Sequence, residues 1–196
     1  MARLRTVSVS GFAVAAVLFA VWTGVQARVP GSHRAATCGG QHTLTIANDG
    51  VARLYGNAAD HAFACDLKNG KNRWLQGASA SQDAFSLSGL YAAWSSNGHE
   101  KVNVVEVDTG AIPNSLPYNT NDYVVRIVVK NDGAVAWAAN TTGANPYVQG
   151  LDRKNHPPDQ FSDDTKYVRG GTLHPTKGHG IAWSYTDGSS GSANLF

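Results

Sequence analysis

The sequence predicts an all-β protein built from four copies of one antiparallel unit. No part of the chain after residue 27 shows a sustained apolar period of 3.6 residues, which argues against amphipathic helices. Turn-forming residues instead recur about every eight to twelve residues between short runs rich in β-branched side chains. An internal repeat is the third observation, and it defines the unit.

The first two strands of the unit are predicted from a shared turn. Residues 44–52 and 127–136 both place an Asn-Asp-Gly turn between apolar residues, which is typical of strand, tight turn, strand. Residues 85–94 and 173–183 share a glycine turn and end in an aromatic residue. We expect these aromatic residues to pack between neighbouring units. The four aromatic residues are Tyr55, Trp94, Trp137 and Trp183, and the intervals between them are 39, 43 and 46 residues.

Two further strands complete the unit. A third strand is predicted about a dozen residues after each aromatic residue, at 62–67, 102–107, 147–151 and 193–195. A weaker fourth strand is predicted at 73–75, 112–116 and 159–161. The last unit has no room for a fourth strand before residue 196.

A unit of this length with four short strands has the size of a propeller blade, which predicts a small β-propeller-like repeat of about four antiparallel blades over residues 42–196. The units resemble those of secreted bacterial β-propeller proteins of the WD40-like and TolB-like type, as found in exported actinobacterial proteins mostly of unknown function. Residues 65–70, 124–137, 151–154 and 183–195 carry the resemblance. The chain departs from the WD pattern because no Trp-Asp dipeptide closes the third strand and no histidine opens each blade.

Four blades are few for a closed ring. Closure could come from residues 28–41 as an added outer strand, or from a second chain that completes the ring as a homodimer. A β-sandwich is the alternative architecture.

The first 27 residues have the features of a signal peptide. Arg3 and Arg5 precede an uncharged stretch whose apolar centre, residues 12–22, suits a signal sequence better than a membrane span. Small residues at Val25 and Ala27 predict cleavage after Ala27 and secretion. The alternative is an uncleaved signal anchor that tethers the chain to the membrane.

The two cysteines, Cys38 and Cys65, predict a disulfide, because an even pair without metal-ligand spacing in an exported protein usually forms one. Two free buried thiols are the alternative.

Charge excludes two classes of partner. The whole chain has 16 Lys and Arg against 14 Asp and Glu, and removal of Arg3 and Arg5 with the leader leaves 14 of each. A chain without net charge gives no electrostatic reason to expect nucleic acid or insertion into an anionic membrane.

No catalytic or cofactor motif is found: the chain contains no Gly-x-Ser-x-Gly elbow, His-Glu-x-x-His pair or P-loop. His174 and His179 flank a turn and, with Asp163 or Asp164, form a weak candidate metal site, against the alternative of solvated turn residues. The sequence therefore predicts neither a catalytic residue nor a cofactor.

These observations favour an exported, non-enzymatic interaction module that binds a protein or another ligand of the cell envelope. A small secreted hydrolase or lyase is the first alternative, with an active site at the rim of the blades drawn from His61, His99, His174 or Asp164. A carbohydrate or cell-wall binder is the second, with Trp74 or Tyr118 as the stacking residue.

Overall fold

The computed structural model describes residues 38–40, 42–96, 101–118, 122–151 and 158–195. The predicted signal peptide, its cleavage after Ala27 and residues 28–37 lie outside the described residues. All the described residues belong to one compact unit, His33–Phe196. No helix within these described ranges is long and apolar enough to cross a membrane.

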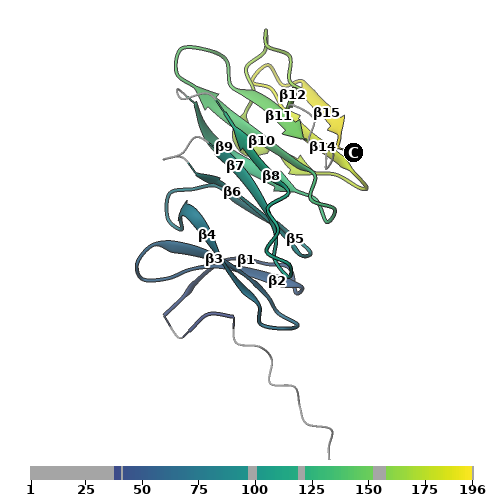
Figure 1. The fold of residues 1–196 in the computed structure, drawn as a ribbon. Helices are drawn as coiled ribbons and strands as arrows, with labels where there is room; N and C mark the ends of the chain where they lie inside the picture. The colour runs from purple at the N-terminus through teal and green to yellow at the C-terminus, as the bar shows by residue number, and fades with distance from the viewer. Residues whose placement is uncertain (1–37, 41, 97–100, 119–121, 152–157, 196) are drawn as a thin grey trace, which may run out of the picture. The chain divides into compact units, whose positions relative to one another are not determined.

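Four antiparallel sheets follow one another along the chain, and within each sheet consecutive strands are neighbours (Figure 1). The first sheet contains β1 (Leu44–Asn48), β2 (Ala52–Gly56), β3 (His61–Asp66) and β4 (Asn72–Ser79). The second contains β5 (Phe85–Ser88), β6 (Tyr91–Ser96), β7 (Lys101–Glu106) and β8 (Asn114–Pro117). The third contains β9 (Asp122–Val129), β10 (Val135–Thr141), β11 (Tyr147–Leu151) and β12 (Asp159–Gln160). The fourth has three described strands, β13 (His174–Pro175), β14 (Gly180–Ser184) and β15 (Ser190–Asn194), after the short 3-10 helix η1 (Gly170–Thr172).

The hydrophobic core consists of layers between consecutive sheets, because neither face of one blade can be buried within that blade. The layer between the first two sheets contains Leu54 and Leu75 from one sheet and Trp94 from the other. Trp137 lies in the next layer, against the second sheet. Trp183 lies in the last layer, against the third sheet. Each of these tryptophans is on the second strand of its sheet and faces the preceding sheet.

Tyr55 occupies the equivalent position in the first sheet, which no other sheet precedes in the described part of the chain. Its ring stacks on Phe63 with centroids 5.4 Å apart, in a small cluster with Cys38 and Cys65. These two cysteines form the predicted disulfide, with Cα atoms 5.6 Å apart. Arg53 donates a hydrogen bond to the Cys38 carbonyl, and its guanidinium lies 5.2 Å from the centre of the Tyr55 ring. The segment Cys38–Gly40, which we call the disulfide cap, thus covers the face that a preceding sheet would cover elsewhere.

The outer face of the fourth sheet is polar and exposed where it is formed by β15, unlike the covered outer face of the first sheet. On β15, Ala193 faces the core and Gly191 pairs with Trp183, so Ser190, Ser192 and Asn194 face the other way. These three residues are exposed. No core cluster of the described residues joins the first sheet to the fourth, so the sheets form an open series.

Hydrogen bonds between turns add to the contacts between sheets. Asp49, in the turn between β1 and β2, accepts a hydrogen bond of 2.6 Å from the Gly89 amide of the second sheet. Asp132, in the equivalent turn of the third sheet, lies 3.2 Å from His179 of the fourth. The buried ammonium of Lys130 donates to the carbonyls of Thr176 and Gly180, at 3.1 Å each. The shared Asn-Asp-Gly turn therefore connects each sheet that carries it to the following one.

The predicted fold class is confirmed, with four antiparallel sheets in series and not the two facing sheets of a sandwich. The predicted fourth strand at 112–116 begins two residues later, at Asn114, and the strand predicted at 159–161 is only Asp159–Gln160. Both lie near prolines, Pro113 and Pro158, which cannot donate to a ladder. Closure by residues 28–41 or by a second chain stays a prediction, although Cys38 itself is bound to the first sheet.

Candidate functional site

A groove of about 600 Å³ lies between the outer strands of the first two sheets. Trp74 on β4 and Ile112, before β8, line it, and they are 55% and 58% exposed. We call it the Trp74 groove. Large apolar side chains exposed together are a common feature of binding surfaces, whereas single ones are common on any surface. Because β4 and β8 are both outermost strands of their sheets, the outward edges of their backbones are free within the described ladders.

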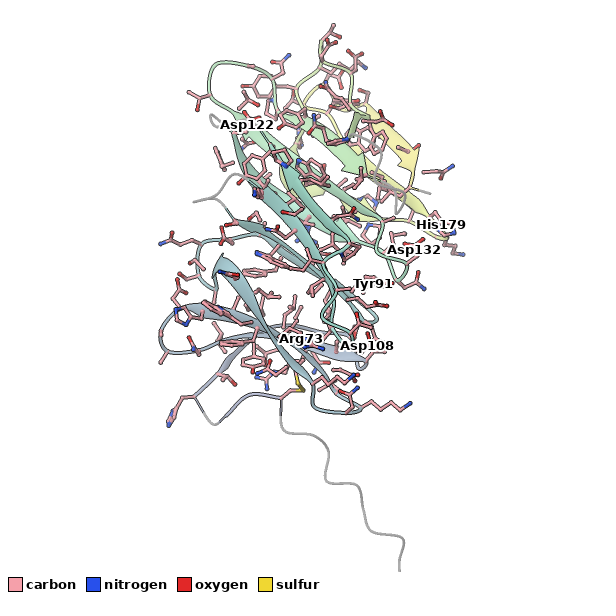
Figure 2. The ribbon with its side chains drawn as sticks, in the orientation of Figure 1. Arg73, Tyr91, Asp108, Asp122, Asp132 and His179 are labelled. Carbon is pink, nitrogen blue, oxygen red and sulfur yellow. A yellow bond between two sulfur atoms is a disulfide. The ribbon has the colours of Figure 1, made fainter. Side chains whose placement is uncertain are left out.

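Positive charge is the second property of the Trp74 groove. Lys101 and Arg73 line it, and no acidic residue does so in the described part of the chain. Arg73 also joins the two sheets, because its guanidinium donates to the carbonyls of Val107 and Asp108 at 2.9 and 2.8 Å. Figure 2 shows Arg73 and Asp108 near one another where these sheets meet. Lys101 is exposed and has no ion-pair partner among the described residues. The groove thus combines exposed apolar side chains with the ammonium of Lys101, which can pair with an acidic ligand.

A second hollow lies at the end of the third sheet where β9 begins, which we call the Asp122 pocket. Figure 2 shows Asp122 at one end of this sheet, away from Asp132. We count two adjacent hollows as its lobes, of about 430 and 240 Å³, because Asp122 and Tyr147 line both. Tyr118 lines the larger lobe and Thr141 the smaller one.

Asp122 is 9% exposed, and among the described residues its carboxylate has one hydrogen-bond partner, the neutral Tyr147 hydroxyl, which donates to Oδ2 at 2.7 Å. Its other oxygen, Oδ1, is buried without a hydrogen-bond partner, and so is Oγ1 of Thr141. Burial, and next the hydrogen bond to Asp122, raises the pKa of Tyr147 above its usual range, so this hydroxyl stays a neutral donor. A buried carboxylate with only one neutral hydrogen-bond partner lowers the stability of the fold unless a ligand or water supplies the missing hydrogen bonds.

The histidines proposed from sequence are not brought together. His179 contacts Asp132, while Nδ1 of His174 lies 2.8 Å from the carbonyl oxygen of Thr172. Asp164 is exposed and lines the small lobe of the Asp122 pocket. No group of three or more histidine, cysteine or acidic residues in the described part of the chain could hold a metal ion.

The remaining candidates have different surroundings. The imidazole of His61 packs near Trp74, with ring centroids 5.6 Å apart. Its neighbour Asp60 instead accepts hydrogen bonds from Ser79 and Ser81. His99 lies outside the described residues. Tyr118 is 8% exposed, so of the two proposed stacking residues only Trp74 presents its ring to solvent.

Comparison with known proteins shows the fold. No protein-family model and no curated protein matches this chain. The Cps50 (Swd1) β-propeller domain of Myceliophteria thermophila matches 80% of the chain with a TM-score of 0.53 and 16% identity. The chain has a β-propeller fold. It covers 52% of that domain, so it spans about half of its length.

Two designed proteins also match. The computationally designed Ika4 protein has a TM-score of 0.54 at 14% identity, over 81% of this chain and 94% of Ika4. The designed Ika8 protein has a TM-score of 0.50 at 12% identity, over 77% of this chain and 45% of Ika8. Identities this low establish a shared architecture and carry no functional assignment. The β-propeller part of the sequence resemblance is therefore confirmed, whereas the bacterial source, secretion and the narrower TolB likeness stay predictions.

The Asp122 pocket was not predicted from the sequence. One signal was present: Asp122 and Val124 take inward positions of β9 while Tyr123 between them is exposed, so an acidic residue occupies an apolar position of the alternation.

Proposed function

We propose that this chain is an exported, non-enzymatic binding module whose Trp74 groove holds an acidic, extended segment of a partner protein. The observation that carries the proposal is the exposure of Trp74 and Ile112 along one groove that contains cations and, in its described lining, no acidic residue. Tryptophan is among the residues that contribute most to protein interfaces.

The backbone of the groove supports an extended ligand. An exposed sheet edge can accept an added strand, with main-chain hydrogen bonds for affinity and side-chain contacts for selectivity. With β4 as that edge, the apolar side chains of the partner would pack on Trp74, and its carboxylates would lie near Lys101 and Arg73.

Export is part of the proposal. Its support is the predicted leader together with the Cys38–Cys65 disulfide, since disulfides persist mainly in oxidising compartments. Binding rather than catalysis is supported by the sequence, which contains no Gly-x-Ser-x-Gly elbow, His-Glu-x-x-His pair or P-loop.

The test is a fluorescence titration of the secreted protein with blocked hexapeptides that alternate valine with glutamate or with lysine. We expect saturable binding of the glutamate peptide only, weakened by added salt and by at least about 30-fold in Trp74→Ala. Lys101→Glu should also weaken it. Tyr167→Ala is the matched control, because Tyr167 is a similarly exposed aromatic residue, at 52%, that does not line the groove.

Three results would contradict the proposal. One is equal binding of both peptides, and another is unchanged binding by Trp74→Ala. The third is binding of an acidic oligosaccharide, such as an oligogalacturonate, in place of the peptide, which would assign the groove to glycans and favour the carbohydrate-binding alternative.

A further inference from the structure

We infer that the Asp122 pocket is a second binding site, for a primary alkylammonium group, at the opposite end of the sheets from the Asn-Asp-Gly turns. The inference rests on two observations. Oδ1 of Asp122 and Oγ1 of Thr141 are buried without hydrogen-bond partners, and tyrosine rings line the pocket beside them.

The two unfilled acceptors lie side by side. Asp122 and Thr141 are direct partners in the ladder between β9 and β10, which places their Cβ atoms roughly 4.5–5.5 Å apart. A primary ammonium carries three N–H donors and no acceptor, so one such group can donate to the Asp122 carboxylate and to Oγ1 of Thr141 at once. A ligand hydroxyl can also contact both groups, by donating to the carboxylate and accepting from the Thr141 hydroxyl, so charge is what distinguishes the two ligands.

Charge also selects a cation. Among the described lining residues of both lobes, the charged side chains are Asp122 and Asp164, and none is basic. The Tyr147 hydroxyl is a weak counterpart for a carboxylate this buried, whereas an ammonium supplies the missing positive charge.

The larger lobe fits the alkyl chain that carries the ammonium. Tyr118, Tyr147 and two prolines, Pro117 and Pro158, line it. Aromatic faces attract both methylene groups and cations. A primary ammonium on an alkyl chain therefore matches the pocket, whether it belongs to a free amine or to a lysine side chain of another protein.

Access requires a small rearrangement, because Oδ1 and Oγ1 are shielded from solvent without a ligand. The last torsion of the Asp122 side chain is broad, so a partial rotation of the carboxylate turns Oδ1 toward the pocket. The same rotation moves Oδ2, so the hydrogen bond from the Tyr147 hydroxyl has to adjust with it.

The experiment is an NMR titration of the secreted, ¹⁵N-labelled protein with n-butylammonium chloride, butan-1-ol and sodium chloride. We expect saturable shifts of amides in β9, β10 and β11 with butylammonium alone. Asp122→Asn should weaken binding at least about tenfold, and Thr141→Val, which keeps the side-chain shape, should weaken it severalfold. Asp159→Asn is the control, because it removes the same charge from an exposed residue outside the pocket lining.

A second titration, with Nα-acetyl-lysine N-methylamide, separates the two sources. Tighter binding of this compound than of butylammonium would assign the site to lysine side chains, and weaker binding would assign it to free amines. Equal binding of butanol and butylammonium would overturn the inference, as would no saturation up to about 50 mM amine. If Asp122→Asn does not fold, unchanged binding in Thr141→Val together with equal binding of butanol refutes it.

Discussion

Removal of the Cys38–Cys65 disulfide, by the double substitution Cys38→Ala and Cys65→Ala, tests the role of the disulfide cap. The bridge closes a loop with a sequence separation of 27 residues. On the chain-entropy model such a loop stabilises the fold by about 3.5 kcal/mol at 25 °C. For a domain of this size, that loss lowers the melting temperature by roughly 7–14 °C.

The assay is thermal unfolding followed by circular dichroism, with and without a reducing agent. We expect the double variant to melt at the lower temperature under both conditions. The wild type should resist reduction while folded, because Cys65 is fully buried and Cys38 nearly so. After reduction in denaturant and refolding, it should melt as the variant does. A fall in melting temperature below about 2 °C would show that the cap does not stabilise the first sheet, and would refute this reasoning.

Two further predictions concern packing and pH. Gly191→Ala should lower the free energy of unfolding by about 1–3 kcal/mol, because the added Cβ would lie 2.4 Å from the Trp183 ring. Urea unfolding measures this loss. Gly171→Ala is the control and should be close to neutral, because its added Cβ would meet nothing within 4 Å. The second prediction follows from the Ser79 hydroxyl, whose hydrogen bond lowers the pKa of Asp60 below its ordinary 3.8. The ionised Asp60 therefore stabilises the fold above the unfolded-state pKa, and this contribution is lost as the pH falls below about 4. Urea unfolding from pH 6 to pH 3 should show wild type and Asp60→Asn converging at acid pH, and a constant difference would contradict the prediction.

Local patterns explain why the strands could be predicted from sequence. Alternation and turn residues act over a few positions, so β1, β3 and β11 lie close to their predicted ranges. The four aligned aromatic residues lie on the second strand of each sheet because one unit repeats. Spacing alone could not show that Tyr55 contacts a disulfide while Trp94 contacts another sheet.

The two proposed binding sites depend on contacts between residues that are distant in sequence, and local patterns do not predict such contacts. Asp122 and Thr141 are neighbours through the register of β9 and β10, and this register shifts at a bulge between Ala138 and Ala139. The Trp74 groove needs two sheets to be in place, so exposure of Trp74 could be proposed but its cationic surroundings could not. Tyr118 was expected at the surface and is buried beside the Asp122 pocket.

The first and fourth sheets differ in what lies on their outer faces, and this difference limits where a further blade can be added. Addition of a blade by tandem duplication requires an apolar face to receive it, and the outer face of the fourth sheet offers Ser190, Ser192 and Asn194. At the other end, a new blade would have to displace the disulfide cap from Tyr55. Duplication of an inner blade meets neither obstacle, because both faces of such a blade already fit its neighbours. Relatives with more blades should therefore carry additional whole blades next to the second or third sheet and retain both ends.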